Sequence, residues 1–273
     1  MSKTIKKRGE IIHIADTIAV RLFGPDDAAI KWIAFPFIGG NSSHFRTLAE
    51  YLTEEWQLVA VDPPAHGQAR GKPVLDIYTL TELYFQLLKP YFKGRFYLFG
   101  HSLGGLVAYL LASRLEEAGH PPGGTVLSAI APPLEIRDFN GWGDRRLGIE
   151  DLNAFLMDSG DKYAAMAGSS MAKFYLPLLN LDYRLLRSFE PERIAPPILK
   201  GKVWIMGSKE DPLSEWDHLG KWEAYAKNIH YLEAVGGHQY ILTHAETVAD
   251  KMIRCVAGTA QEGEGNDDSP GRH

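Results

Sequence analysis

The stretch that decides the fold reads Arg95-Phe96-Tyr97-Leu98-Phe99-Gly100-His101-Ser102-Leu103-Gly104-Gly105. Its first half, residues 96–99, is an unbroken apolar run, which predicts a short buried strand. Residues 103–117 place their leucines and valine on one face and so predict a helix. Between the two lies a G-x-S-x-G pentapeptide, whose glycines permit a sharp turn from strand to helix. Such a turn raises the Ser102 hydroxyl above the edge of a sheet and marks it as a candidate nucleophile.

Composition narrows the class of protein. The 273 residues, 45% apolar and 23% charged, suit one large soluble α/β domain. A net charge of −5 gives no reason to expect a nucleic-acid partner. The single cysteine, Cys255, excludes an internal disulfide and fits a reducing compartment. Residues 1–10 lack the apolar core of a secretory signal, and no run approaches the roughly 20 apolar residues of a membrane span, so we expect a cytoplasmic protein without membrane contact.

Strand and helix patterns alternate along the predicted main domain, residues 31–256. The predicted strands are residues 31–37, 57–62, 96–99, 124–130, 202–206 and 229–234. Because these strands are apolar throughout, they favour a mostly parallel sheet with helices on both faces. The preceding residues 1–30 are expected to form a basic arm and a possible hairpin at 11–23. Residues 257–273 are rich in Gly, Asp and Glu and are expected to be a disordered tail.

Residues 134–199 interrupt this alternation. They contain no good strand pattern, and their periodicity predicts helices at 149–159, 163–174 and 178–189. Helices inserted after a strand beside the nucleophile are typical of a lid over an active site, with ordinary sheet-covering helices as the alternative. Four apolar side chains of this segment are candidates for substrate contact: Met157, Met166, Met171 and Phe174.

Partners for the serine follow two later strands. A serine hydroxyl needs a base to accept its proton and a third group to orient that base. Asp211 and His238 each lie in a loop after a predicted strand, so parallel strands would bring them to the same sheet edge as Ser102. The chain order Ser, Asp, His is that of α/β-hydrolases. Glu210 is the alternative acid, but the turn expected at Asp211 and the following proline suits a short, fixed carboxylate.

Three other histidines are not expected to act as the base. We interpret His101 as a packing residue of the turn, His66 as a loop residue at the mouth of the pocket, and His244 as a surface residue of the last helix. No histidine cluster has the spacing of metal ligands, and a lone cysteine cannot form a thiolate zinc site. We therefore expect neither a metal nor another cofactor.

Two backbone N–H groups are candidates for an oxyanion hole. The Leu103 N–H begins the helix after the turn, where it faces any charge that develops beside Ser102. The strand at 31–37 ends in a glycine-rich loop, which can present N–H groups to a ligand. Phe37 is the favoured second donor in that loop, and its neighbour Ile38 is the alternative.

Several stretches resemble the type II (external, editing) thioesterases of nonribosomal peptide and polyketide synthesis. The similar stretches are residues 35–40, 100–105, 176–186, 207–212 and 236–238. The run Leu-Pro-Leu-Leu-Asn-Leu-Asp-Tyr-Arg-Leu-Leu at 176–186 is the most specific, because the others occur across α/β-hydrolases. The resemblance implies an α/β-hydrolase fold and the catalytic set Ser102, Asp211 and His238, with Phe37 and Leu103 as oxyanion donors.

The resemblance also implies a substrate and a partner. Its members remove stalled or wrong acyl groups from the phosphopantetheine arm of acyl or peptidyl carrier proteins, which would be transient partners here. Arg137, Arg145 and Arg146 could dock an acidic carrier, although solvated loop charges explain them equally. The loop at 62–67 reads Asp-Pro-Pro-Ala-His-Gly, closer to general hydrolases, so a small-molecule esterase remains an alternative. A ligand-binding relative without catalysis is a third possibility, against which the complete catalytic set argues.

Overall fold

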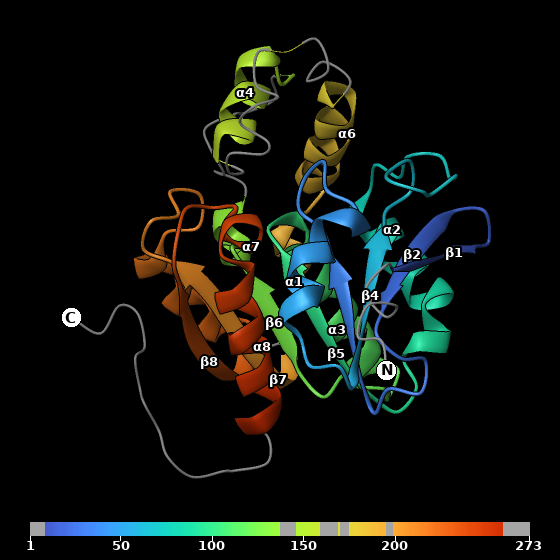
Figure 1. Cartoon of the computed structure of the whole chain (residues 1–273). Helices are drawn as coiled ribbons and strands as arrows, with labels where there is room; N and C mark the ends of the chain where they lie inside the picture. The colour runs from blue at the N-terminus through green and yellow to red at the C-terminus, as the bar shows by residue number, and fades with distance from the viewer. Residues whose placement is uncertain (1–8, 137–145, 159–168, 170–174, 195–198, 259–273) are drawn as a thin grey trace.

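A central sheet organises the chain. The computed structural model describes residues 9–136, 146–158, 169, 175–194 and 199–258. Within them, eight strands form one sheet in the order β1-β2-β4-β3-β5-β6-β7-β8 (Figure 1). The strands are β1 (Glu10–Ile14), β2 (Ile18–Phe23), β3 (Ile30–Phe35), β4 (Trp56–Asp62), β5 (Arg95–His101), β6 (Thr125–Ser128), β7 (Leu199–Ser208) and β8 (Ala226–Ala234).

The sheet is parallel apart from one edge. β1 and β2 form an antiparallel hairpin at the stretch predicted as one, and β2 runs antiparallel to β4. All pairs from β4 through β3 to β8 are parallel. Their carboxyl ends therefore meet at one edge, where ligands bind in open α/β sheets. This confirms the predicted α/β-hydrolase architecture.

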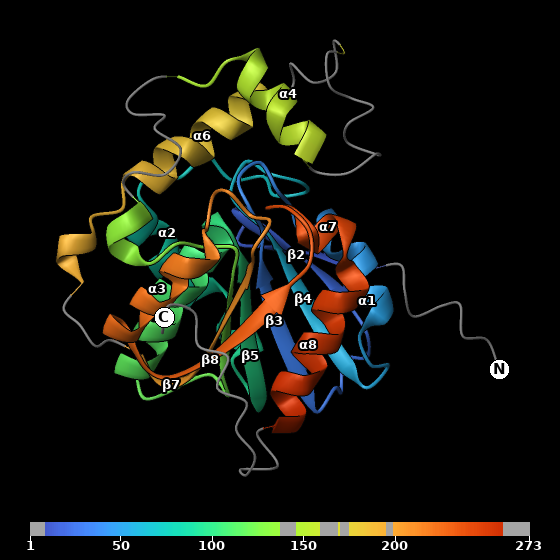
Figure 2. The same cartoon turned by 90° about the vertical axis from the view of Figure 1, so that its left-hand side faces the viewer.

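Helices cover both faces, as expected for strands that are apolar throughout. One face is covered by the 3-10 turn η1 (Ser42–Phe45), α1 (Arg46–Tyr51), α7 (Tyr240–Thr243) and α8 (Ala245–Gly258). The other face is covered by α2 (Ile77–Leu87), α3 (Leu103–Glu117) and the 3-10 helix η6 (Trp216–Ala224) (Figure 2). Each face has its own apolar cluster, joined to the other through the sheet.

The last helical segment of the chain, predicted as one helix, is in fact two, α7 and α8. His244 leaves the helical conformation, with φ −130°, and its carbonyl accepts the first hydrogen bond of α8 from the Val248 N–H. His244 thus lies at the boundary and not within a helix, as a residue in the cap position does. The helical segment after β3 is also divided, because its first residues form η1, capped by the Asn41 side chain, and only then does α1 begin.

The segment between β6 and β7 contains no strand among its described residues. It contributes α4 (Ile149–Asp158), α6 (Leu176–Arg187) and the short 3-10 turn η5 (Pro191–Arg193). Figures 1 and 2 place α4 and α6 above the carboxyl ends of the parallel strands. Met157 on α4 is 63% exposed. The helix predicted at 163–174, with Met166, Met171 and Phe174, lies outside the described residues.

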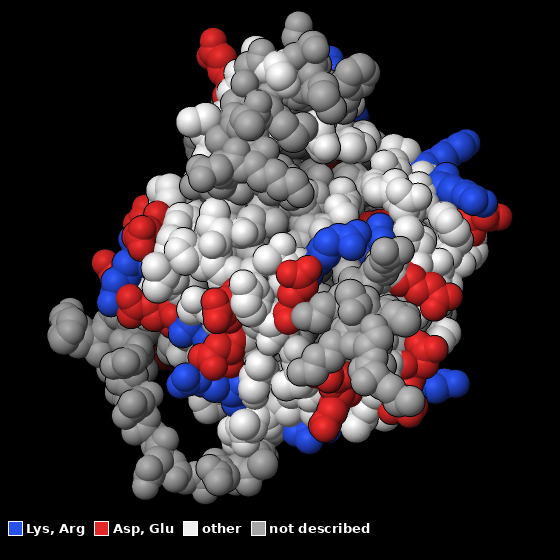
Figure 3. All heavy atoms as spheres, in the orientation of Figure 1, with Lys and Arg blue, Asp and Glu red and all other residues white. Residues whose placement is uncertain are grey.

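The surface carries charges of both signs. On the described part of the face in Figure 3, acidic and basic side chains are interspersed. Arg146 is exposed, while Arg137 and Arg145 lie outside the described residues, as do residues 1–8 of the predicted arm and residues 259–273 of the predicted tail. A search of the described residues for a helix able to cross a membrane found none of sufficient length and apolarity.

Candidate active site

The turn at Ser102 has the geometry that its sequence predicts. Ser102 follows β5 with φ 55° and ψ −121°, and α3 begins at the next residue. A Cβ on Gly100 would lie 1.9 Å from the Gly104 carbonyl oxygen, and a Cβ on Gly104 would lie 2.1 Å from that of Phe35. Only glycine fits at these two positions, because any side chain would collide with the neighbouring backbone.

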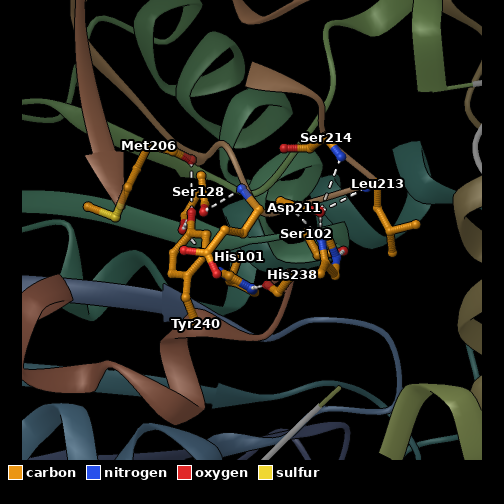
Figure 4. Close-up of polar contacts among 11 residues, drawn as sticks. His101, Ser102, Ser128, Met206, Asp211, Leu213, Ser214, His238 and Tyr240 are labelled. Atoms are coloured by element: carbon orange, nitrogen blue, oxygen red, sulfur yellow. Dashed lines mark hydrogen bonds and ion pairs between the residues drawn. The ribbon is translucent and has the colours of Figure 1, made fainter. Parts of the chain in front are cut away.

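Three predicted side chains meet at the carboxyl edge of the sheet (Figure 4). The Ser102 Oγ lies 2.9 Å from His238 Nε2, and His238 Nδ1 lies 2.9 Å from Asp211 Oδ2 and 3.0 Å from Oδ1. Asp211 follows β7 and His238 follows β8, which are neighbouring parallel strands. All three side chains are buried. A serine, an imidazole and a carboxylate in this order can activate the hydroxyl as a nucleophile.

The carboxylate of Asp211 is held in its charged form. Burial alone would raise its pKa, but the hydrogen bond and charge of His238, together with the Leu213 N–H, lower it overall. The Leu213 and Ser214 N–H groups donate to Oδ1 at 2.8 and 3.3 Å. A charged, fixed carboxylate orients the imidazole and stabilises its protonated form during the reaction.

The alternative acid, Glu210, has a different contact. Its Oε1 accepts a hydrogen bond of 3.1 Å from the Gly236 N–H, in the loop that carries His238. Glu210 therefore links the loop after β7 to the loop after β8 without touching the imidazole. Of the two acids, Asp211 is the one in contact with His238.

His101 has a larger role than the predicted packing. Its Nε2 lies 2.8 Å from the His238 carbonyl oxygen, and its Nδ1 lies 2.9 Å from Ser128 Oγ. Burial lowers the pKa of His101 to about 3, so the ring is neutral. Because Nε2 faces a carbonyl, it carries the hydrogen, and Nδ1 accepts from Ser128. The only sequence signal for this role was a histidine at the end of a buried apolar strand.

A second buried hydroxyl continues this chain of hydrogen bonds. Tyr240 OH lies 2.7 Å from Ser128 Oγ and 2.9 Å from the Met206 carbonyl oxygen (Figure 4). Because the Ser128 hydrogen is directed to His101, the single Tyr240 hydrogen is shared between these two acceptors. The chain runs from α7 through β6 to the turn and ends on the backbone of His238. It holds the backbone of His238, whereas Asp211 holds the imidazole, and it complements the loop contact of Glu210.

The candidate oxyanion donors lie at the ends of two adjacent strands. Leu103 is the first residue of α3, so its N–H belongs to the positive end of the helix dipole. Phe37 and Ile38 follow β3, which pairs with β5. The Phe37 ring packs against those of His44 and His101, with centroids 5.0 and 6.1 Å apart. Backbone N–H groups placed in this way can stabilise the oxyanion of an acyl-transfer reaction.

His66, predicted to lie at the mouth of the pocket, pairs with a carboxylate of α6. It is buried, and its Nε2 lies 3.1 Å from Asp182 Oδ2 on α6. No local pattern in the sequence indicates this pair, since its members are distant in the chain. Among the described residues, no three His, Cys, Asp or Glu side chains are grouped so that they could hold a metal ion.

Comparisons with known proteins agree with this geometry. Residues 31–255 match the thioesterase domain family. The chain is 25% identical over 262 residues to a probable cadicidin biosynthesis thioesterase of Streptomyces griseus (92% of this chain, 70% of the relative), and 26% identical over 240 residues to thioesterase PikA5 of Streptomyces venezuelae (84% and 82%). The type II thioesterase BorB from the borrelidin biosynthetic cluster has a similar structure, with a TM-score of 0.76 at 24% identity, covering 89% of this chain and 98% of that chain. The chain therefore belongs to the thioesterase domain family and is a thioesterase of the serine hydrolase class.

Proposed function

We propose that the chain is a type II thioesterase that hydrolyses acyl groups from the phosphopantetheine arm of carrier proteins. The observation that carries the proposal is the buried chain of contacts from Ser102 through His238 to Asp211. In the proposed roles, Ser102 is the nucleophile, His238 the general base and Asp211 its orienting acid. Phe37 and Leu103 donate their N–H groups to the oxyanion, with Ile38 as the alternative to Phe37.

Acylation of the serine begins the proposed reaction. The Ser102 oxygen forms a bond to the thioester carbonyl carbon as its proton passes to His238 Nε2. The carbonyl oxygen becomes an oxyanion between the two N–H groups. When the carbon–sulfur bond breaks, the imidazolium returns its proton to the departing thiolate of the pantetheine arm.

Hydrolysis of the acyl-enzyme completes the cycle. His238 takes a proton from a water molecule, whose oxygen attacks the acyl carbonyl through a second oxyanion. Collapse of this intermediate breaks the bond to Ser102, which recovers its proton from His238. The products are a free carboxylic acid and a carrier with a free thiol.

The substrate assignment has separate support. The run at 176–186, which carries the resemblance to editing thioesterases, forms α6 above the catalytic edge. Proteins similar over most of this chain include a probable cadicidin biosynthesis thioesterase and a type II thioesterase from the borrelidin biosynthetic cluster. We propose that α4 and α6 belong to a lid, spanning residues 134–199, that admits an acyl chain on a long flexible arm. We further propose that Met157, Met166, Met171 and Phe174 contact that chain.

The test compares the rate at which one acyl group is hydrolysed from a carrier protein with the rate from free pantetheine. Acetyl-loaded carrier protein and free acetyl-pantetheine are incubated with the enzyme, and loss of the acetyl group is followed by mass spectrometry. We expect kcat/KM on the carrier to exceed that on the free thioester by about tenfold or more. Ser102→Ala should lower turnover of both by about 10³-fold or more, because the nucleophile is lost.

Two outcomes would contradict the proposal at different points. Turnover retained by Ser102→Ala would show that another group is the nucleophile. Equal rates on carrier and free thioester, together with fast hydrolysis of simple oxygen esters, would leave the chemistry in place and assign the enzyme to small-molecule esters.

A further inference from the structure

We propose that Asp182, on α6, is a positioning residue for the oxyanion hole, acting through Gly39 and charge-paired with His66. The inference rests on the proposed hydrolysis at Ser102. It concerns a residue of α6 that does not touch the triad. It means that α6 affects the rate of the chemical step, in addition to its proposed role in admitting the substrate.

The first observation is a direct contact between α6 and the loop after β3. The Gly39 N–H donates a hydrogen bond of 2.7 Å to Asp182 Oδ2, across 143 positions of the sequence. Asp182 is only 5% exposed. Within the loop, the Gly40 N–H donates to the Phe37 carbonyl at 2.8 Å and closes a tight turn. Holding Gly39 therefore fixes the turn that contains the candidate donors Phe37 and Ile38.

The second observation is the close approach of α6 at the same point. Gly39 has φ +72°, and a Cβ built on it would lie 2.7 Å from Leu179 Cδ1. Leu179 and Asp182 are three residues apart and so share one face of α6. The helix thus contacts the loop through an apolar side chain and a carboxylate together. Glycine at 39 is what allows this contact.

The third observation explains how a carboxylate is tolerated there. His66 Nδ1 lies 3.0 Å from the Pro64 carbonyl oxygen, and its Nε2 lies 3.1 Å from Asp182 Oδ2. Both ring nitrogens face acceptors, so the imidazolium, with a hydrogen on each, suits the site better than either neutral form. A buried carboxylate left without such a partner would be costly.

The surrounding charges favour the same form. Burial lowers the pKa of His66, but the nearby charge of Asp182, with the Pro64 carbonyl and Asp62, raises it overall. Tyr84 on α2 is a further titratable group near Asp182 and Asp62, and it is fully buried. Burial, Asp182 and Asp62 together raise the pKa of Tyr84 well above its usual value, so the phenol stays neutral.

The loop is held from two sides. Asp62, at the end of β4, accepts a hydrogen bond of 2.6 Å from the Ser42 N–H and one of 2.9 Å from the Gln68 N–H. The far end of the loop is therefore attached to the sheet, whereas the end near Phe37 is attached to α6 through Gly39. Loss of Asp182 would free the end that carries the candidate donors while the other end stays in place.

The experiment measures kcat and KM on a small free thioester, acetyl-pantetheine. We expect Asp182→Ala to lower kcat by about 10- to 100-fold, since displacing an oxyanion donor acts on the transition state. KM should change by less than about threefold. Asp182→Asn keeps an amide oxygen that can accept from Gly39, so it should recover most of kcat.

A matched control lies on the same helix. Asn180 accepts from the Leu147 N–H at 2.8 Å and donates to the Leu147 carbonyl at 3.1 Å, so it ties α6 to the segment before α4. Asn180→Ala should leave kcat within about twofold. If both alanine variants lost kcat equally, general loosening of α6 would explain the loss and the inference would fail.

The remaining outcomes separate this inference from the proposed function. A wild-type kcat in Asp182→Ala, with Ser102→Ala inactive, overturns the inference alone. Activity in Ser102→Ala overturns the proposed function instead. Circular dichroism checks folding, and if Asp182→Ala did not fold, Asp182→Ser would replace it with the same expected loss, because its hydroxyl is too short to reach Gly39.

Discussion

At the residue scale, Ser102 combines a reactive position with an unfavourable backbone. Its φ of 55° and ψ of −121° lie where only glycine is relaxed. The conformation is imposed by its surroundings, because the Ser102 N–H donates to the Ser128 carbonyl at 2.8 Å and glycines 100 and 104 allow close packing on both sides. Strain of this kind costs on the order of 1–3 kcal/mol and is common at catalytic positions.

This strain predicts a difference between two inactive variants. Ser102→Gly and Ser102→Ala both lose the contact with His238, but only alanine keeps the strain. We expect Ser102→Gly to be the more stable by about 1 kcal/mol, after allowing for the greater entropy of unfolded glycine. Urea unfolding of both variants measures the difference. An alanine variant as stable as the glycine variant would show that the turn is not strained.

Single residues also show what sequence could and could not predict. Ser102, Asp211 and His238 were predictable because each has a local signal, a pentapeptide or a loop after an apolar strand. His101 and Asp182 had no such signal. Their partners, the His238 backbone and Gly39, are 137 and 143 positions away, and one sequence does not encode such pairings in any local pattern.

At the element scale, the attachment of α6 depends on a titratable pair. The pKa of His66 is raised in the folded protein, by Asp182 against the effect of burial. A raised pKa means that the folded state binds the proton more tightly than the unfolded state. The stabilisation is therefore fully present below the unfolded value of about 6.5, and is lost as pH rises through the folded value.

The pair predicts a pH-dependent change in stability. We expect His66→Gln to have a lower Tm than the wild type below about pH 6.5. This gap in Tm should narrow as pH rises through the pKa of His66 in the folded protein. Thermal unfolding from pH 5 to pH 9 measures the gap. His218, a surface histidine beside Glu135 and Glu215, provides the control, because His218→Gln removes only ion pairs at the surface. A gap for His66→Gln that stayed constant with pH would contradict a charged His66.

At the scale of the whole molecule, one sheet joins two apolar clusters. Leu111 on α3 belongs to one cluster and Met252 on α8 to the other, and both side chains are fully buried. The sheet itself was predictable, since central strands buried on both faces must be apolar. The break at His244 and the 3-10 form of η6 were not, because tertiary contacts overrode the local helical pattern.

The shared sheet predicts a single cooperative transition. Leu111→Ala and Met252→Ala should each lower the free energy of unfolding by about 2–5 kcal/mol. Both should shift the same urea transition, observed together by tryptophan fluorescence and far-UV circular dichroism. Two separate transitions, with each substitution moving only one, would show that the faces unfold independently.

The contact between Asp182 and Gly39 also bears on how enzymes of this architecture can be recombined. Helix α6 and the loop after β3 share a hydrogen bond, so with the proposed roles they form one functional unit split between distant parts of the chain. A graft of residues 134–199 from another enzyme would need an acceptor facing Gly39. Without one, the chimaera would accept its new substrates but turn them over slowly. The grafted helix would no longer hold Gly39, and with it the loop that carries the candidate oxyanion donors.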